Sequence, residues 1–146
     1  RTHSTFTVAE ARDVVLRSFD EVGIRDAERV YNQYPHELSG GMRQRVMIAM
    51  AIDARPRLLI ADEATSALDV TVQAAVLDTL DRLAEERGMA VLMITHDMGV
   101  VARFCDVVTV MYRGSVVEHG PTAEILTDPQ HEYTRGLLAA VPRLHA

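Results

Sequence analysis

Two short, almost wholly apolar runs constrain the fold of this chain more than any other feature. They are residues 58–61 (Leu-Leu-Ile-Ala) and residues 90–95 (Ala-Val-Leu-Met-Ile-Thr). A run that is apolar at every position is typical of a parallel strand buried on both faces. The segment between the runs, residues 70–86, has helical spacing and is followed by Gly88, a typical helix terminator. This order of strand, helix and strand predicts an α/β fold whose mostly parallel sheet is covered by helices.

Further elements flank this central unit. Apolar residues recur at helical spacing near the start of the chain, and Ser39 can cap a helix that begins at Gly40. Helices are expected at residues 8–22, 26–31, 40–53, 97–104, 121–126 and 131–140, and strands at 107–111 and 115–118. We therefore expect a small helical subdomain over residues 1–54 and a sheet-containing part over residues 55–146.

Composition narrows the classes of function. The 146 residues carry a formal net charge of −6, which argues against general nucleic-acid binding, because such binding usually needs a basic face. The single Cys105 cannot form an internal disulfide, which fits a reducing, intracellular compartment. The longest apolar run, residues 46–52, is far shorter than the roughly 20 residues that cross a bilayer.

An acidic pair follows the first apolar run. Ligands of open α/β sheets bind beyond the carboxyl ends of the strands, where Asp62 and Glu63 are expected. There Asp62 could hold Mg²⁺, which prefers oxygen ligands, and Glu63 could take a proton from an attacking water. The alternative is that the pair merely caps the strand end or the next helix.

Three other places carry candidate site residues. Ser39-Gly40-Gly41 places small residues at a helix start, where free amides and the helix dipole attract anions, although an ordinary glycine turn explains the same letters. His96 follows the second apolar run and could donate a hydrogen bond to a phosphate or hold Glu63, or be structural. Asp69 is equally explained as a helix cap, and we expect structural roles for Arg43 and Arg45.

Taken in order, these motifs resemble the nucleotide-binding subunit of ATP-binding cassette (ABC) transporters. By this resemblance Leu38–Gly41 is the signature motif, Asp62-Glu63 ends the Walker B strand, Ser66–Asp69 is the D-loop, and His96 is the switch histidine. The resemblance implies the C-terminal part of a P-loop (RecA-like) ATPase, a small helical signature subdomain, the start of a C-terminal extension, and ATP and Mg²⁺ as cofactors.

The same resemblance implies a division of labour between two cassettes packed head to tail. Glu63 and His96 would be catalytic and Asp62 would hold the metal, all for the nucleotide of their own chain. Ser39, Gly40, Gly41 and Asp69 would contact nucleotide, the signature residues reaching ATP held mainly by a partner cassette. We accordingly expect Gly41→Asp to block hydrolysis with little loss of stability.

Two longer stretches indicate a subfamily. Residues 34–49 and the tail at residues 131–138 resemble bacterial oligopeptide/dipeptide importer ATPases and their nickel-importing relatives, although Ala64 stands where many members have Pro. The implied partners are a second ABC ATPase subunit, two permease subunits and, indirectly, an extracytoplasmic binding protein, at the cytoplasmic face of the membrane. Alternatives are a nickel or other importer, a truncated cassette acting only as a binding partner, and a soluble cassette ATPase of DNA repair or translation.

One motif is missing from the sequence. ATPases of this kind grip nucleotide with a G-x-x-x-x-G-K loop followed by Ser or Thr, and no such loop occurs here. We therefore expect the intact subunit to be an ATPase, and we expect the 146 residues on their own to be inactive.

Overall fold

A computed structural model describes residues 7–64 and 68–140 of the chain. The contacts divide it into two compact units, Arg1–Leu92 and Met93–Ala146, and the division falls within a strand. Each unit is described by itself below. The boundary near residues 54 and 55 that the sequence suggests stays a prediction.

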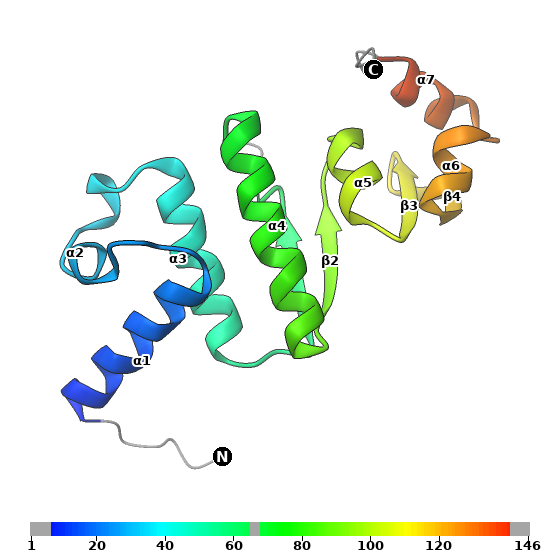
Figure 1. Cartoon of the computed structure of the whole chain (residues 1–146). Coiled ribbons are helices and arrows are strands. Elements are labelled where there is room, and N and C mark those ends of the chain that lie inside the picture. Colours follow the sequence, from blue (N-terminus) through cyan, green and yellow to red (C-terminus); the bar gives the residue numbers. More distant parts are fainter. Residues whose placement is uncertain (1–6, 65–67, 141–146) are drawn as a thin grey trace. The chain divides into compact units, whose positions relative to one another are not determined.

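The first unit begins with helices and continues into a pair of strands (Figure 1). Its elements are α1 (Val8–Glu21), α2 (Ala27–Tyr31), the 3₁₀ helix η1 (Pro35–Glu37), α3 (Gly40–Asp53), β1 (Leu58–Asp62), α4 (Val70–Arg87) and β2 (Ala90–Ile94). Side-chain caps set the helix starts: Thr7 and Glu10 form a capping box on α1. Gly88, in the left-handed region at φ 58°, ends α4 as expected.

Strands β1 and β2 form a two-stranded sheet. The Arg57 carbonyl, just before β1, accepts a hydrogen bond of 3.0 Å from the amide of Ala90, the first residue of β2. Since the two strands begin side by side, they run parallel, and α4 is the crossover between them. The predicted α/β arrangement of strand, helix and strand is confirmed.

The prediction that both apolar runs are fully buried is wrong for the described residues. Ala61 is only 6% exposed, whereas Leu58, Ile60 and Leu92 are 52%, 59% and 49% exposed. Successive side chains of a strand point to opposite faces, and the described part of the chain covers just one face of this sheet. The uncovered face therefore exposes Leu58, Ile60 and Leu92.

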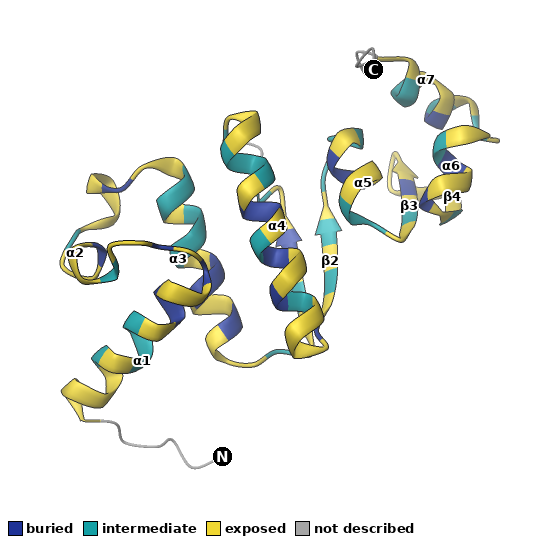
Figure 2. Ribbon diagram, viewed as in Figure 1, coloured by how far each residue is buried: buried dark blue, intermediate teal, exposed yellow. Residues whose placement is uncertain are grey.

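The core of the first unit lies among its helices (Figure 2). Its most deeply buried side chains include Val22 at the end of α1, Ile52 of α3, and Val76 and Leu83 of α4. Polar contacts tie the same helices together. The Ser18 hydroxyl lies 3.2 Å from an Asp53 carboxylate oxygen, joining α1 to α3.

The second unit contains α5 (Met98–Phe104), β3 (Val107–Tyr112), β4 (Ser115–Pro121), α6 (Thr122–Thr127) and α7 (Glu132–Ala140). Strands β3 and β4 pair antiparallel, with an irregularity between Val110 and Met111. They are joined at Arg113 and Gly114, whose φ angles of 49° and 82° are both positive, as the tightest hairpin turns require. The predicted turn at Arg113-Gly114 is confirmed.

Helix α7 is anchored to β4 by a carboxylate. Glu118 accepts hydrogen bonds from the backbone amides of Gln130 (2.7 Å) and His131 (3.2 Å), just before the helix. The pKa of Glu118 is lowered by the nearby Thr134 hydroxyl and by the amide of Gln130, which favour the charged carboxylate. The Thr134 hydroxyl is close to Glu118 but does not reach hydrogen-bonding geometry. Among residues 7–64 and 68–140, no helix is long and apolar enough to cross a membrane.

Candidate functional site

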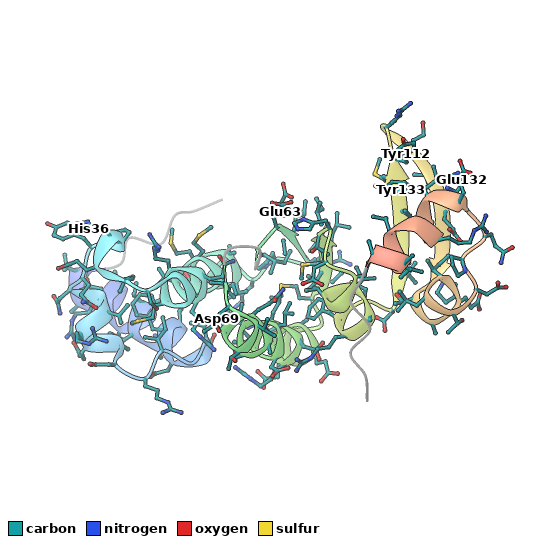
Figure 3. The ribbon with its side chains drawn as sticks, turned by 90° about the horizontal axis from the view of Figure 1, so that it is seen from above. His36, Glu63, Asp69, Tyr112, Glu132 and Tyr133 are labelled. Atoms are coloured by element: carbon teal, nitrogen blue, oxygen red, sulfur yellow. The ribbon has the colours of Figure 1, made fainter. Side chains whose placement is uncertain are left out.

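The acidic pair lies where the strand β1 ends. Asp62 is its last residue, and Glu63 follows with a positive φ of 46°. Both side chains are exposed, and Figure 3 shows Glu63 pointing away from the ribbon. A left-handed backbone at a residue other than glycine costs about 1–3 kcal/mol, and such strain concentrates at functional sites. The expected place of the pair, at the carboxyl end of the strand, is confirmed.

The signature residues form the start of α3. The Ser39 hydroxyl accepts a hydrogen bond of 3.3 Å from the Met42 amide, so the predicted cap is confirmed. The first amides of a helix have no partner within the helix, and the positive end of its dipole lies there. This geometry suits an anion such as phosphate. Binding of nucleotide by Ser39, Gly40 and Gly41 stays a prediction.

Gly41 has a packing role that the amino-acid sequence did not indicate. A Cβ atom at this position would lie 2.4 Å from Cγ1 of Val72, far inside van der Waals contact. At Gly40, a Cβ would lie 3.4 Å from Cδ2 of Leu68. This contact argues against the expectation that Gly41→Asp causes little loss of stability, because Cγ1 of Val72 occupies the space that a side chain would need.

Asp69 caps α4. Its carboxylate oxygen Oδ1 accepts a hydrogen bond of 2.9 Å from the Val72 amide, which is the structural alternative that the sequence left open. A second role of Asp69 in contacting nucleotide stays a prediction. Ser66, also expected in the D-loop, lies outside the described residues.

Helices α3 and α4 lie side by side and run in the same direction. Gly41 contacts Val72 near their starts, and the Ile52 carbonyl accepts a hydrogen bond of 2.8 Å from Arg87 near their ends. One contact joins the starts of the two helices and the other joins their ends, which is possible only if the helices run parallel. Ser39–Gly41 and Leu68-Asp69 therefore meet at one end of this pair, and Figure 3 shows Asp69 at the start of α4.

His96 belongs to the second unit, just after β2, and is exposed. It lies in a tight turn, since the Asp97 amide donates a 3.0 Å hydrogen bond to the Thr95 hydroxyl. Asp97 in turn caps α5 by accepting from the Gly99 amide at 2.8 Å, a role that sequence reasoning missed. That His96 approaches Glu63 stays a prediction, as does its part in catalysis.

Asp62 suits a magnesium ion better than a metal held by protein alone. Among the described residues, no three His, Cys, Asp or Glu side chains gather as a metal site. Mg²⁺ usually takes one or two carboxylates together with waters and substrate phosphates, so one exposed aspartate at the end of a strand is a ligand that it can use. Binding of Mg²⁺ by Asp62 stays a prediction.

A parallel strand that ends in an acidic pair and is followed by a crossover helix occurs in α/β domains that bind ligands at the carboxyl ends of their strands. Comparison with known proteins makes this more specific. Residues 2–66 match the ABC transporter family model, and residues 117–146 match the C-terminal region of oligopeptide/dipeptide transporters. The chain belongs to the ABC transporter family.

Several relatives in sequence are named as import proteins. A putative peptide import ATP-binding protein of Brucella ovis is 54% identical over 99% of this chain and 43% of its own length. The glutathione import ATP-binding protein GsiA of Escherichia coli (strain K12) is 54% identical over 100% of this chain and 23% of its own length. The chain thus spans less than half the length of these relatives.

Solved structures agree on the fold. A putative metal-chelate type ABC transporter in an inward-facing conformation matches with a TM-score of 0.77, at 27% identity, over 97% of this chain and 53% of that one. A dimeric bacterial ABC transporter cassette matches with a TM-score of 0.71, at 32% identity, over 83% of this chain and 51% of that one. The P-loop ATPase fold expected from the sequence is confirmed.

The contact at Gly41 yields a stability prediction. We expect Gly41→Ala to lower the free energy of unfolding by about 1–3 kcal/mol, because its methyl group would overlap Val72. The matched control is Gly136→Ala in α7, where a Cβ meets nothing within 4 Å, and which we expect to be neutral or to stabilise by up to about 1 kcal/mol.

Urea denaturation of both variants in the full-length subunit, and of Gly41→Ala combined with Val72→Ala, measures this. The double variant should recover part of the loss, since the smaller residue at position 72 makes room. Equal stability of Gly41→Ala and Gly136→Ala would show that α4 does not confine Gly41.

Proposed function

We propose that this chain is part of the ATP-binding and ATP-hydrolysing subunit of an ABC importer that drives uptake of oligopeptides or dipeptides. The observation that carries the proposal is the pairing of two matches in one chain, the ABC transporter family at residues 2–66 and the oligopeptide/dipeptide transporter C-terminal region at residues 117–146. Relatives named for the import of peptides and of glutathione, itself a short peptide, support it.

In this proposal the acidic pair acts on the nucleotide of its own subunit. Asp62 holds Mg²⁺, which when bound neutralises charge on the phosphates. Glu63 orients the attacking water and accepts its proton, which a carboxylate within hydrogen-bond reach can do. His96 stabilises the terminal phosphate or fixes Glu63. Two features of Glu63 support this assignment: its side chain is exposed, and its backbone has a positive φ just after the strand, a strain of the kind found at functional sites.

The helix starts act on a second nucleotide. The α3 start at Ser39–Gly41 and the neighbouring Asp69 face ATP held mainly by a partner ATPase subunit. Their parallel packing supports this role, because two positive helix ends then meet at one place. The dimeric state of a similar solved cassette supports the presence of a second subunit. In the assembly we propose, the pair of ATPases lies at the cytoplasmic face of the membrane beneath two permease subunits, which receive cargo from an extracytoplasmic binding protein.

Replacement of Glu63 tests the chemistry. In the full-length subunit we expect Glu63→Gln to reduce phosphate release at least about 100-fold while Mg-ATP still binds, because glutamine keeps the shape but cannot accept the proton. The measurements are steady-state phosphate release and equilibrium binding of Mg-ATP. Glu85→Gln, an exposed carboxylate of α4, is the control and should behave as wild type. Near-normal turnover of Glu63→Gln would remove Glu63 from the role of base.

Uptake by a deletion strain tests the cargo. Cells lacking the full-length gene should lose uptake of labelled di- or oligopeptides, and expression of the wild-type gene, but not of its Glu63→Gln variant, should restore it. Peptide uptake that persists while nickel uptake fails would replace peptide by nickel. If neither changes, the importer assignment is wrong.

A further inference from the structure

His96 lies between two residues whose side chains accept hydrogen bonds from backbone amides. On one side, the Thr95 hydroxyl accepts a hydrogen bond of 3.0 Å from the Asp97 amide. On the other side, Oδ1 of Asp97 accepts from the amide of Gly99 at 2.8 Å and from that of Val100 at 3.4 Å. Each side chain thus closes a short turn on the backbone that follows it. The backbone of His96 is enclosed in the first turn, and the second turn begins directly after it.

The second turn is tied to a buried helix. Val100 and Val101 of α5 are only 3% and 5% exposed, so this helix is held by packing. The Asp97 carbonyl accepts a hydrogen bond of 3.1 Å from the Val101 amide, in addition to the bonds that its carboxylate accepts. Asp97 is therefore bound to α5 through both its main chain and its side chain.

Gly99 gives the Asp97 carboxylate the room that it needs. A Cβ at position 99 would lie 3.1 Å from Oδ1 of Asp97, closer than ordinary van der Waals contact. His96 itself is exposed. Because the rotamers open to a side chain depend on its backbone angles, the turns on either side of His96 restrict the directions in which its ring can point.

We propose that Thr95 and Asp97 are positioning residues, which hold the backbone of His96 so that its ring reaches the terminal phosphate or Glu63 in one orientation. This inference rests on the proposed function, in which His96 acts on one of these two groups. Thr95 and Asp97 act through His96 and do not themselves contact the nucleotide. Loss of either turn gives the ring more orientations, and a misplacement of about 1 Å in a group at a reacting centre can cost about 100-fold in rate.

Turnover of variants in the full-length subunit tests the inference. Thr95→Val removes the hydroxyl and keeps the shape, and its matched control is Thr127→Val, which removes another bond between a hydroxyl and the backbone. Asp97→Ala removes the side-chain cap of α5, and its matched control is Thr7→Ala, which removes that of α1. Thr95→Val and Asp97→Ala should lower kcat about 10- to 100-fold, whereas both controls should stay within about twofold of wild type.

Two readouts separate positioning from support of the fold. Phosphate release is expressed per subunit that binds Mg-ADP, so that any unfolded fraction does not count, and the affinity for Mg-ADP should stay within about twofold in every variant. Thr95→Ser and Asp97→Asn keep an oxygen that can accept the same bonds, and they should recover most of the kcat. Wild-type kcat in Thr95→Val and in folded Asp97→Ala overturns the inference, and Thr95→Val alone decides it if Asp97→Ala does not fold.

A double-variant comparison shows whether the effect passes through His96. In the His96→Ala background, Thr95→Val and Asp97→Ala should lower the remaining kcat no further, because residues that act through His96 have no effect once its ring is gone. A further loss as large as in the wild-type background overturns the inference. Wild-type kcat in His96→Ala itself would remove both His96 and its two neighbours from the proposed site, whereas absence of turnover in the wild-type subunit would overturn the proposed function.

Discussion

The direct packing of α3 on α4 is the constraint on which the rest of the first unit depends. It needs a residue without a side chain at position 41, because Cγ1 of Val72 occupies that space. It also needs Arg45, whose hydrogen bonds reach α4 and the end of α1. With the helices held parallel, the glycine-rich start of one lies beside the aspartate-capped start of the other. Folding and site construction thus use the same contact.

The acidic pair depends on a different local feature. Strand β1 carries Asp62 to the edge of the sheet, and the left-handed backbone of Glu63 ends the strand there. Such strain persists only where the surrounding structure holds it. A carboxylate displaced from the strand in this way is exposed, which suits the proposed contact of Glu63 with water and phosphate. The same unit therefore combines a strained acidic edge with a closely packed pair of helix starts.

Local features were predictable from the sequence, and contacts between distant residues were not. The apolar runs predicted β1 and β2, Ser39 predicted the start of α3, and Arg113-Gly114 predicted the hairpin turn. The contact of Gly41 with Val72 and the partners of Arg45 depend on packing between elements, which periodicity does not encode. Burial of Leu58 and Ile60 was wrongly expected. An apolar sequence shows that a strand can be buried on both faces, but it does not show that the described residues cover both faces.

The parallel packing of α3 on α4 is measured most directly as a distance between spin labels on the two helices. Labels at Met50→Cys and Thr71→Cys, both exposed, in a full-length subunit whose other cysteines, Cys105 included, are replaced and which is diluted with unlabelled subunits, report the position of one helix along the other. Met50 lies near the end of α3 and Thr71 near the start of α4, so a parallel pair predicts one narrow distribution at a long distance in the subunit without nucleotide. A broad distribution, or one at the short distance that an antiparallel pair would give, would contradict the account.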